Sequence, residues 1–381
     1  MKPAMPRLSE ANSLRRSKHD SKWMGYALDL AVRGGRSVSP NPQVGACVVK
    51  NGRLLGAGYH RVFGGDHAEI CALREAGKEA EGADLYVTLE PCSTPAKTPP
   101  CVDSILAAGV SRVVLGVLDP NPRHAGRALK ILEEAGIETV HGIQGDRAAR
   151  LIEPFSKWIR TGLPFVTLKM AQSLDGKIAC FNGRSRWITG PEARRWVHEL
   201  RKTSDAILVG KNTAKLDNPR LRAELSRSAL QETKPWRIVV DPRMELQPGC
   251  RIFQGRQITL RAVEKSYLPK CAVPKRASGF ANILAVKSRR GRIDFKDLLS
   301  QLGGLGISKL LVEGGGETAW TLLHEGLVDR ICWIVAPKFI GGRSAVSSLE
   351  GDGYSNPNTC PSPRTLNCRP LGSDWLFEGS F

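Results

Sequence analysis

Two series of alternating strand and helix patterns limit this chain to a small set of folds. The first series opens with strands over 44–50 and 54–59 around Asn51-Gly52, which is a strong hairpin signal. Helix patterns then follow over 67–75, 102–108, 127–135 and 151–160, with strand patterns over 85–89 and 112–118. Strands alternating with helices of this length predict an α/β layer structure.

The stretch Thr161-Gly162-Leu163-Pro164 contains chain breakers and separates the two series. The second series has strands over 165–170, 206–209, 237–240, 309–312 and 330–335 and helices over 191–202 and 317–325. Because 381 residues suffice for two domains, we expect α/β domains over 20–162 and 163–381. Segments 222–232 and 262–290 have poor periodicity, which indicates loops or weak strands.

The chain begins with a polar, basic segment, residues 1–19, that has little periodicity and is expected to be a mobile tail. Asp20 fits the N-cap of the first helix, because apolar residues recur at helical spacing from Trp23 onward. Gly34-Gly35 ends that helix.

Composition and charge narrow the range of possible functions. No apolar run approaches the roughly 18 residues of a membrane-spanning helix and no secretory signal is present, so we expect a cytoplasmic protein without a membrane partner. Ten scattered cysteines favour reduced thiols, some of them metal ligands, over a disulfide scaffold. The net charge of +19 fits nucleic acid, small phosphorylated ligands, or a basic surface without a dedicated partner.

One group of residues carries zinc chemistry. His67 opens a predicted helix, Cys92 follows a predicted strand, and Cys101 starts the next helix. One imidazole and two thiolates suit tetrahedral zinc with a fourth position open for water. Zinc lowers the pKa of that water, and the resulting hydroxide can attack an amino-bearing ring carbon while Glu69 transfers the proton to the departing ammonia.

The pattern His-x-Glu followed by Pro-Cys is the signature of zinc nucleobase deaminases. Eight residues separate Cys92 from Cys101 here, where the nucleic-acid-editing members have two. The alternative interpretation is structural: His67 caps a helix and the cysteines are small core residues. The joint occurrence of all four residues in the correct strand and helix context favours the zinc site.

Several motifs together resemble the pyrimidine deaminase of riboflavin biosynthesis, which has a cytidine-deaminase-like α/β fold. They are Ser39-Pro40-Asn41-Pro42-Gln43-Val44-Gly45, Gly58-Tyr59-His60, His67-Ala68-Glu69, Glu90-Pro91-Cys92-Ser93, Lys97-Thr98-Pro99-Pro100-Cys101 and Asp119-Pro120-Asn121-Pro122. The resemblance implies a substrate pocket lined by Asn41, His60, Lys97, Asp119 and Asn121, with Lys97 as a partner for a phosphate. Taken singly, each of them also fits a turn residue beside proline.

One loop departs from this family. The family usually has His directly after Pro-Cys-Ser and Gly two positions later, whereas this chain has Thr94 and Ala96. The substrate contact of that His is therefore in question. We still expect a working deaminase, because the ligands and Glu69 are present.

The second half resembles the reductase partner of the same pathway, a dihydrofolate-reductase-like α/β domain. The resemblance rests on residues 168–179, Trp187-Ile188-Thr189, Val209-Gly210, Asp217-Asn218-Pro219, Glu313-Gly314-Gly315-Gly316 and residues 336–342. The triple glycine between a strand and a helix lets backbone N–H groups approach an anion, although alone it also fits a tight turn. The Gly-x-Gly-x-x-Gly fingerprint is absent, which disfavours a Rossmann fold.

The resemblance also implies the residues of the reductase site. Those expected to contact NADPH are Ala171, Trp187, Thr213, Asp217, Gly315, Gly316, Glu317, Thr318, Ala319 and Trp320. Those expected to contact the substrate are Ser185, Arg201, Leu221 and Glu313. Lys169 and Asp175 are further polar groups around the first strand, and Asp175 also fits a simple Asp-Gly turn.

This half departs from its family at two positions. Asn212 replaces the Gly that precedes Thr213, and Glu224 replaces a phosphate-binding Arg. A carboxylate would repel a phosphate, so we expect Arg222, or Arg220, to take that role by a local shift.

The sequence thus predicts a bifunctional enzyme of riboflavin biosynthesis that uses Zn²⁺ and NADPH. It deaminates 2,5-diamino-6-(5-phosphoribosylamino)pyrimidin-4-one and then reduces the ribosyl chain to give 5-amino-6-(5-phosphoribitylamino)uracil. We expect a homo-oligomer acting on this small phosphorylated pyrimidine, with no nucleic-acid partner. Two alternatives remain: a nucleic-acid-binding zinc deaminase, and a monofunctional deaminase with an impaired reductase half.

Overall fold

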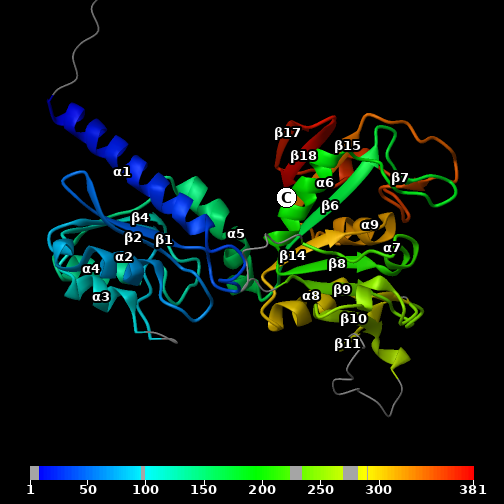
Figure 1. The fold of residues 1–381 in the computed structure, drawn as a ribbon, viewed down its shortest axis with the longest axis horizontal. Helices are drawn as coiled ribbons and strands as arrows, with labels where there is room; N and C mark the ends of the chain where they lie inside the picture. The colour runs from blue at the N-terminus through cyan, green and yellow to red at the C-terminus, as the bar shows by residue number, and fades with distance from the viewer. Residues whose placement is uncertain (1–7, 96–98, 224–233, 269–281, 290) are drawn as a thin grey trace, which may run out of the picture. The chain divides into compact units, whose positions relative to one another are not determined.

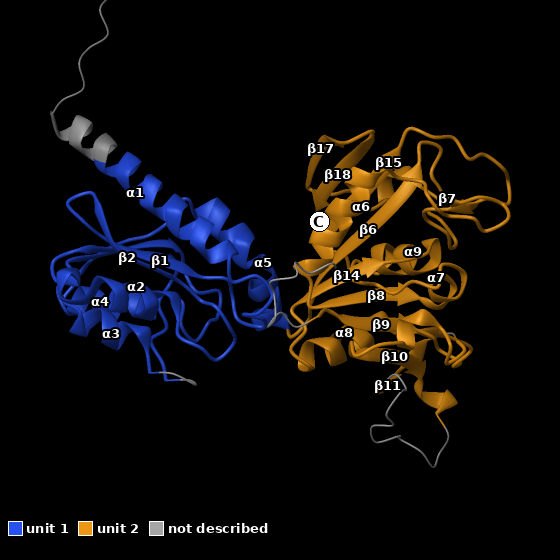
Figure 2. Cartoon of the chain, viewed as in Figure 1, with its two compact units in different colours: residues 1–161 blue, residues 162–381 orange. Residues whose placement is uncertain are grey.

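The computed structural model describes residues 8–95, 99–223, 234–268, 282–289 and 291–381. The chain divides into two compact units, residues 1–161 and 162–381 (Figure 2). Each unit has its own sheet and its own hydrophobic core. No helix in the described part of the chain is both long and apolar enough to cross a membrane.

Unit 1 contains a five-stranded sheet in the order β2-β1-β3-β4-β5. The predicted hairpin is confirmed: β1 (Gly45–Lys50) and β2 (Arg53–Tyr59) pair antiparallel, and Asn51 and Gly52 have positive φ angles of 53° and 76°. β1 is also antiparallel to β3 (Asp84–Leu89), which is parallel to β4 (Arg112–Val117), and β4 is parallel to β5 (Glu138–Val140). The segments that precede β1 and follow β2, β3 and β4 therefore meet at one edge of the sheet.

Helices cover both faces of this sheet (Figure 1). α2 (Ala68–Ala76), α3 (Cys101–Ala107) and α4 (Arg127–Glu134) pack on one face, where Leu85 and Val87 of β3 point. α1 (Leu8–Val32) and α5 (Gly145–Thr161) pack on the other face. Successive residues of β1 and β3 point to opposite faces, so both faces of these strands are buried, as an α/β layer structure requires.

The prediction that Asp20 caps the first helix is wrong, because α1 already begins at Leu8. Asp20 lies inside this helix and is 3% exposed. Its carboxylate accepts hydrogen bonds from both terminal nitrogens of Arg112, at 2.9 and 2.7 Å, and from the Tyr86 hydroxyl at 2.8 Å. Asp20 therefore anchors α1 to the sheet through a buried ion pair, a role that an aspartate near a polar segment does not reveal.

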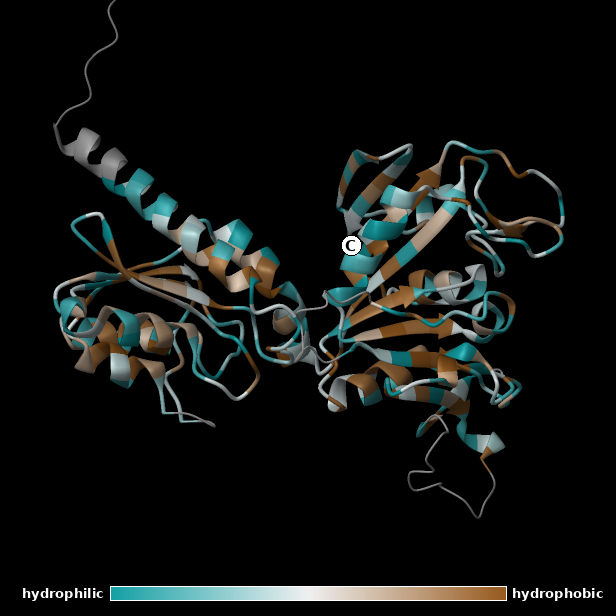
Figure 3. Cartoon of the chain, in the orientation of Figure 1, coloured by the Kyte–Doolittle hydropathy of each residue, from teal (hydrophilic) through white to brown (hydrophobic). Residues whose placement is uncertain are grey.

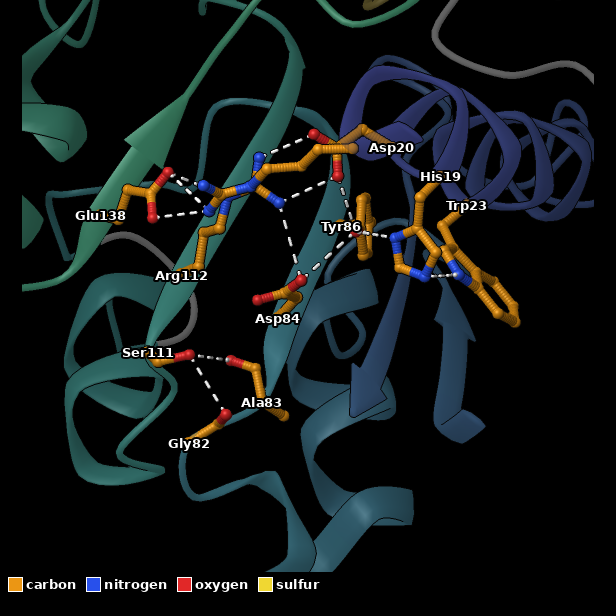
Figure 4. Close-up of polar contacts among 11 residues, drawn as sticks. His19, Asp20, Trp23, Gly82, Ala83, Asp84, Tyr86, Ser111, Arg112 and Glu138 are labelled. Atoms are coloured by element: carbon orange, nitrogen blue, oxygen red, sulfur yellow. Dashed lines mark hydrogen bonds and ion pairs between the residues drawn. The ribbon is translucent and has the colours of Figure 1, made fainter. Parts of the chain in front are cut away.

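Figure 4 shows that Arg112 lies at the centre of this polar cluster. Its guanidinium also lies 3.6 Å from Asp84 Oδ2 and 3.3 Å from Glu138 Oε1. On the other side, Trp23 Nε1 donates to His19 Nε2 at 3.0 Å, which leaves His19 Nδ1 to donate to the Tyr86 hydroxyl at 3.2 Å. The buried charges are thus satisfied by partners from α1, β3, β4 and β5.

Unit 2 contains a nine-stranded sheet in the order β11-β10-β9-β8-β14-β6-β15-β18-β17, in which β18 runs antiparallel to both of its neighbours, β15 and β17, and all other pairs are parallel. Its strands are β6 (Phe165–Ser173), β8 (Ala206–Gly210), β9 (Trp236–Val240), β10 (Thr259–Glu264), β11 (Asn282–Val286), β14 (Lys309–Glu313), β15 (Arg330–Ala336), β17 (Thr365–Leu371) and β18 (Asp374–Ser380). β6 and β15 are parallel, so the antiparallel pairing is confined to the β15-β18-β17 edge. Figure 3 shows that the central strands are predominantly hydrophobic, which fits their burial on both faces.

Helices again cover both faces of the sheet. α8 (Phe295–Gly304) and α9 (Gly316–His324) pack on one face, and α6 (Pro191–Lys202) and α7 (Lys211–Leu216) pack on the other. The remaining short elements are strands β7 (Lys177–Ala179), β12 (Ser288–Arg289), β13 (Arg292–Ile293) and β16 (Val346–Ser347) and 3₁₀ turns at Gly77–Ala80, Arg251–Phe253, Lys265–Tyr267 and Pro357–Thr359.

Two segments of unit 2, residues 222–232 and 262–290, were predicted to be loops or weak strands. Within 262–290, β10 and β11 are strands at one edge of the main sheet, where half-exposed residues blur the alternation. Within 222–232, only Arg222 and Ala223 belong to the described residues. α8 and the antiparallel β17-β18 pair were not predicted from the sequence, and the exposed pattern of β17 explains the second omission.

Replacing Asp20 with Ala should lower the free energy of unfolding by about 3 kcal/mol at neutral pH, because a buried guanidinium loses its main counter-charge. Burial alone raises the pKa of Asp20, but hydrogen bonds from Arg112 and Tyr86 bring it below the ordinary 3.8. The carboxylate therefore stabilises the fold above that value, and this contribution is lost as the pH falls through the lowered pKa. Urea unfolding followed by tryptophan fluorescence should show a difference that shrinks in acid.

The control is Asp29→Ala on the same helix, because Asp29 forms an exposed ion pair with Arg147. An exposed pair of this kind contributes about 0.5 kcal/mol. Equal losses of stability for the two variants would contradict the assigned role of the Asp20–Arg112 pair.

Candidate functional site

The predicted deaminase residues come from segments that meet at one edge of the unit 1 sheet. Asn41 precedes β1, His60 follows β2, Cys92 follows β3 and Asp119 follows β4. Ligands bind at the carboxyl ends of parallel strands in α/β proteins, so this edge is the expected position of a site. Lys97 and Ala96 lie outside the described residues.

His67, Cys92 and Cys101 form a compact group of possible metal ligands, with the three ligand atoms within 4.8 Å of one another. His67 Nδ1 lies 3.2 Å from Cys101 Sγ and 3.6 Å from Cys92 Sγ. The residues come from the start of α2, the segment after β3 and the start of α3. The structural alternative for His67 receives no support, because its side chain makes no capping hydrogen bond.

The chemistry of these ligands fits zinc. One imidazole nitrogen and two sulfurs match the borderline-soft preference of Zn²⁺, and three protein ligands leave the fourth position open. The Cys101 thiol and the His67 ring donate toward the Cys92 sulfur, and they hold the pKa of Cys92 at about 4 against the effect of burial. Cys92 therefore presents a thiolate, which is the form that binds a metal.

Glu69 lies in the first turn of α2, two residues after His67, and is 3% exposed. Burial raises the pKa of its carboxyl group above the ordinary value of 4.5. A carboxyl group with a raised pKa can both accept and return a proton near neutral pH. α2 packs close enough to β2 for this because Gly58 has no side chain: a Cβ there would lie 2.5 Å from the carbonyl oxygen of Ala68.

Asn41 and His60 form a buried polar pair beside the candidate metal site. His60 Nδ1 donates to the carbonyl oxygen of Asp66 at 3.0 Å, which leaves Nε2 as the acceptor for the Asn41 amide at 3.3 Å. Burial lowers the pKa of His60, so its ring is neutral near neutral pH. The ring lies edge-on to that of His67, with 5.3 Å between centroids.

Glu90 organises the segment after β4, a role that sequence reasoning missed. Its carboxylate is 3% exposed and accepts three backbone N–H bonds, from Asp119 at 3.0 Å, Gly126 at 2.9 Å and Ala128 at 3.0 Å. Asp119 in turn accepts from the backbone N–H of Asn121 at 2.8 Å. The position of both predicted substrate residues therefore depends on Glu90, which stands next to the Pro91-Cys92 motif.

In unit 2, a cavity of about 570 Å³ brings most of the predicted reductase residues together. Those that line it are Ala171, Ser185, Trp187, Arg201, Thr213, Asp217, Leu221, Arg222 and Glu313. Lys169, Arg220, Arg251 and Gly314 line it as well. Inside it, the Ser185 hydroxyl donates to Asp217 Oδ1 at 2.6 Å.

A buried charged triad occupies one wall of this cavity. Arg201 binds Glu313 through two parallel hydrogen bonds of 2.5 and 2.7 Å, and Lys169 Nζ lies 4.0 Å from the same carboxylate. Burial raises the pKa of Glu313, but the charges of Arg201 and Lys169 lower it more, so the carboxylate is ionised. Burial lowers the pKa of Lys169, which makes its ammonium group a better proton donor.

The glycine-rich turn lies beside this cavity, but its residues have different surroundings. Gly315 faces Thr213, whose hydroxyl lies 3.5 Å from where a Cβ would stand. Ala319 is fully buried in the core, and Trp320 is 7% exposed and packs on Tyr354 with 4.8 Å between ring centroids. The side chains of Ala319 and Trp320, which belong to α9, thus contribute to packing.

The structure describes only one of the two residues of unit 2 that differ from the family pattern. Asn212 is exposed in α7, a position where an ordinary side chain fits. Glu224 lies outside the described residues. The backbone carbonyl of Arg222 accepts hydrogen bonds from Arg201 and from His198, each 3.2 Å, so α6 fixes the segment that carries Arg220 and Arg222.

Two family models match the chain. The model described as "Cytidine and deoxycytidylate deaminase zinc-binding region" matches residues 17–117, and the model described as "RibD C-terminal domain" matches residues 164–377. The chain thus joins a zinc-binding deaminase domain to an NADPH-dependent reductase domain.

Proteins of similar length have the same arrangement. The riboflavin biosynthesis protein RibD of Aquifex aeolicus is 40% identical over 330 residues (87% of this chain, 90% of that protein), and RibD of Escherichia coli is 41% identical over 333 residues (84% and 89%). The solved structure of Acinetobacter baumannii RibD, form 1, is 35% identical with a TM-score of 0.85 and covers 96% of this chain and 99% of that chain. The chain therefore belongs to the RibD family of bifunctional riboflavin biosynthesis enzymes.

These comparisons confirm several predictions. The fold class is confirmed, with a cytidine-deaminase-like domain followed by a dihydrofolate-reductase-like one. The paired deaminase and reductase activities, with Zn²⁺ and NADPH as cofactors, are confirmed too. The two alternatives, a nucleic-acid deaminase and a monofunctional deaminase, are not favoured, since RibD relatives cover both halves of the chain.

Replacing Glu90 with Gln should raise the KM of deamination about tenfold, because one side of the amide would present N–H groups to backbone N–H donors. The segment carrying Asp119 and Asn121 would shift, whereas zinc content and NADPH-dependent reduction should stay unchanged. Steady-state deamination kinetics and metal analysis measure these effects. Glu134→Gln, on the exposed face of α4, is the matched control, and an unchanged KM in the Glu90 variant would remove Glu90 from the positioning role.

Proposed function

We propose that the residues grouped in unit 1 deaminate 2,5-diamino-6-(5-phosphoribosylamino)pyrimidin-4-one, and that those lining the cavity of unit 2 then reduce the ribosyl chain. The observation that carries this proposal is the cluster of His67, Cys92 and Cys101 with the buried carboxyl group of Glu69 beside it. The final product would be 5-amino-6-(5-phosphoribitylamino)uracil.

In the deaminase step, Glu69 moves the protons. His67, Cys92 and Cys101 would hold Zn²⁺, which when bound would supply a Lewis acid for the activation of water. Glu69 takes the first proton from the attacking water and delivers it to a ring nitrogen, then takes the second from the hydroxyl that is now bound to the ring carbon and delivers it to the amino group, which leaves as ammonia. The raised pKa of Glu69 suits both transfers.

The remaining predicted residues bind and orient the pyrimidine. The Asn41 amide is held by His60, and Asp119 and Asn121 are held by Glu90, so these groups present fixed donors and acceptors. Lys97, outside the described residues, is proposed as the partner of the substrate phosphate. Pre-positioned polar groups lower the cost of binding because little reorganisation remains to be done.

In the reductase step, NADPH supplies the reducing equivalents. We assign Ala171, Trp187, Thr213, Asp217 and Gly315 to cofactor binding. We also assign to it the first residues of α9, which are Gly316, Glu317, Thr318, Ala319 and Trp320. We assign Ser185, Arg201, Leu221, Arg222 and Glu313 to the substrate. Glu313, fixed by Arg201, can accept hydrogen bonds from ribosyl hydroxyls, and Lys169 can donate a proton to the opening sugar oxygen.

The proposal extends to the cellular setting. We place the enzyme in the cytoplasm as a homo-oligomer acting on a small phosphorylated pyrimidine, without a nucleic-acid or membrane partner. Both steps act on one free nucleotide-like molecule, which accounts for a basic protein without a nucleic-acid partner.

Mass spectrometry of products made from the diaminopyrimidinone ribosyl phosphate tests the proposal. Wild-type enzyme should give the deaminated ribosyl product without NADPH and the deaminated ribityl product with it. Glu69→Gln should retain zinc but lose deamination by about 10³-fold, because proton transfer is lost. The variant should still reduce deaminated ribosyl substrate supplied directly.

Exposed Glu75→Gln on the same helix is the control, although Glu75 accepts a hydrogen bond from the Ala57 backbone and some loss of stability is expected. Full deamination by the Glu69 variant would overturn the assignment of Glu69. Loss of zinc in that variant would place Glu69 among the groups that hold the metal.

A further inference from the structure

A second cavity, of about 810 Å³, adjoins the reductase cavity in unit 2. Its charged lining consists of Arg220, Arg222, Lys234, Arg237, Arg251 and Arg256. Three of these, Arg220, Arg222 and Arg251, also line the reductase cavity, so the two cavities share a wall. No Asp or Glu of the described residues lines the second cavity.

Arg237 and Arg251 have no counter-charge among the residues that the structure describes. Arg237 is 2% exposed and donates to the carbonyl oxygens of Gln254 and Gln257, at 2.9 and 3.0 Å, yet its buried Nε–H has no hydrogen-bond partner in the described part of the chain. Arg251 Nε is likewise buried, and no described residue offers it a hydrogen bond. Within the described ranges, neither guanidinium forms an ion pair. Burial of an unpaired cation is unfavourable, and burial accordingly lowers the pKa of Arg237 to about 10.

Positive charges are also concentrated in the wall that the two cavities share. Arg220, Arg222 and Arg251 all line it, and the like charges of Arg251 and Arg222 lower the pKa of Arg220. The Asn218 side chain accepts the backbone N–H of Arg251 at 2.7 Å and thereby holds it against the segment that carries Arg220. A bound anion would relieve this repulsion, and the planar forks of arginine match the oxygens of a phosphate.

We propose that this second cavity is a phosphate-binding site, with Arg251 in the wall that it shares with the reductase cavity. The phosphate has two possible sources: the phosphorylated end of the reductase substrate, which rests on the proposed function, or a separate phosphate-bearing molecule. Both sources require the same arginine groups.

Calorimetric titration of the full-length enzyme with inorganic phosphate at low ionic strength tests the site. Arg256→Ala should weaken phosphate binding about tenfold, because a charge-assisted hydrogen bond is lost. Lys234→Ala should weaken it as well and provides a second variant at an exposed position of the lining. Arg364→Ala is the matched control, since Arg364 is exposed beside β17 at the opposite edge of the sheet.

Reductase kinetics then distinguish the two sources. If the substrate supplies the phosphate, inorganic phosphate competes with it, and Arg256→Ala raises the KM for the phosphorylated substrate but not for its dephosphorylated form. If a separate molecule supplies it, phosphate still binds the substrate-saturated enzyme. Phosphate binding that is absent, or equal in wild type and all three variants, overturns the proposal. The titration needs no turnover, so failure of the reductase assignment would be recognised separately.

A second observation concerns His124 in unit 1. Its Nε2 lies 3.5 Å from the Thr94 hydroxyl, a long contact, and its Nδ1 has no hydrogen-bond partner among the described residues. His124 stands in the segment that Glu90 anchors, between Asn121, whose carbonyl oxygen accepts the backbone N–H of His124 at 2.9 Å, and Gly126. Among the described residues, no short hydrogen bond fixes the His124 ring, so it is free to contact a ligand.

We infer that His124 supplies an imidazole contact to the deaminase substrate from the side of the site where Thr94 lies. The inference rests on the proposed deaminase function. His124→Ala should raise the KM of deamination about tenfold and leave zinc content unchanged. Adding Thr94→His to that variant should restore the KM, which a merely structural role of His124 would not explain.

His141→Ala, at an exposed position of the same unit, is the control. An unchanged KM in His124→Ala, or no rescue by Thr94→His, overturns the inference. Absence of deamination in the wild-type enzyme would instead refute the deaminase assignment itself.

Discussion

Buried carboxylates at the carboxyl ends of strands hold the sites of both units in place. Glu90 follows β3 and accepts three backbone N–H bonds, and Glu313 ends β14 and binds Arg201 through both oxygens. Asp241 follows β9 and accepts the backbone N–H groups of Glu245 and Leu246. A buried charge is costly unless every partner is in place, so each carboxylate fixes the segment that it binds.

Local patterns in the sequence predicted the elements and the metal ligands, because strand alternation, turn glycines and ligand spacing are short-range features. The hairpin at Asn51-Gly52 and the group of His67, Cys92 and Cys101 are examples. The role of Glu90 could not be predicted, although it lies within a quoted motif, because its partners are backbone groups 29 to 38 residues away. Asp20 was misassigned for the same reason: its partner Arg112 is 92 residues distant.

Where the excess basic residues lie in the structure says more about the ligand than the net charge does. A net charge of +19 does not distinguish nucleic acid from small phosphorylated ligands. The structure shows that some of this charge is concentrated in the second cavity of unit 2, whose described lining contains five arginines and a lysine but no carboxylate. Concentration in a cavity favours a small anion, because a nucleic-acid backbone needs an extended basic surface.

Whether a residue that differs from the family pattern impairs a site depends on the groups that surround it. A substrate requires a donor or a charge at a position in space, and the fold can bring that group there from more than one segment. His124 reaches toward Thr94 from the segment after β4, and Arg251 lines the reductase cavity beside Arg220 and Arg222. A residue that differs from the family pattern therefore disables a site only when no neighbouring segment supplies the same chemistry.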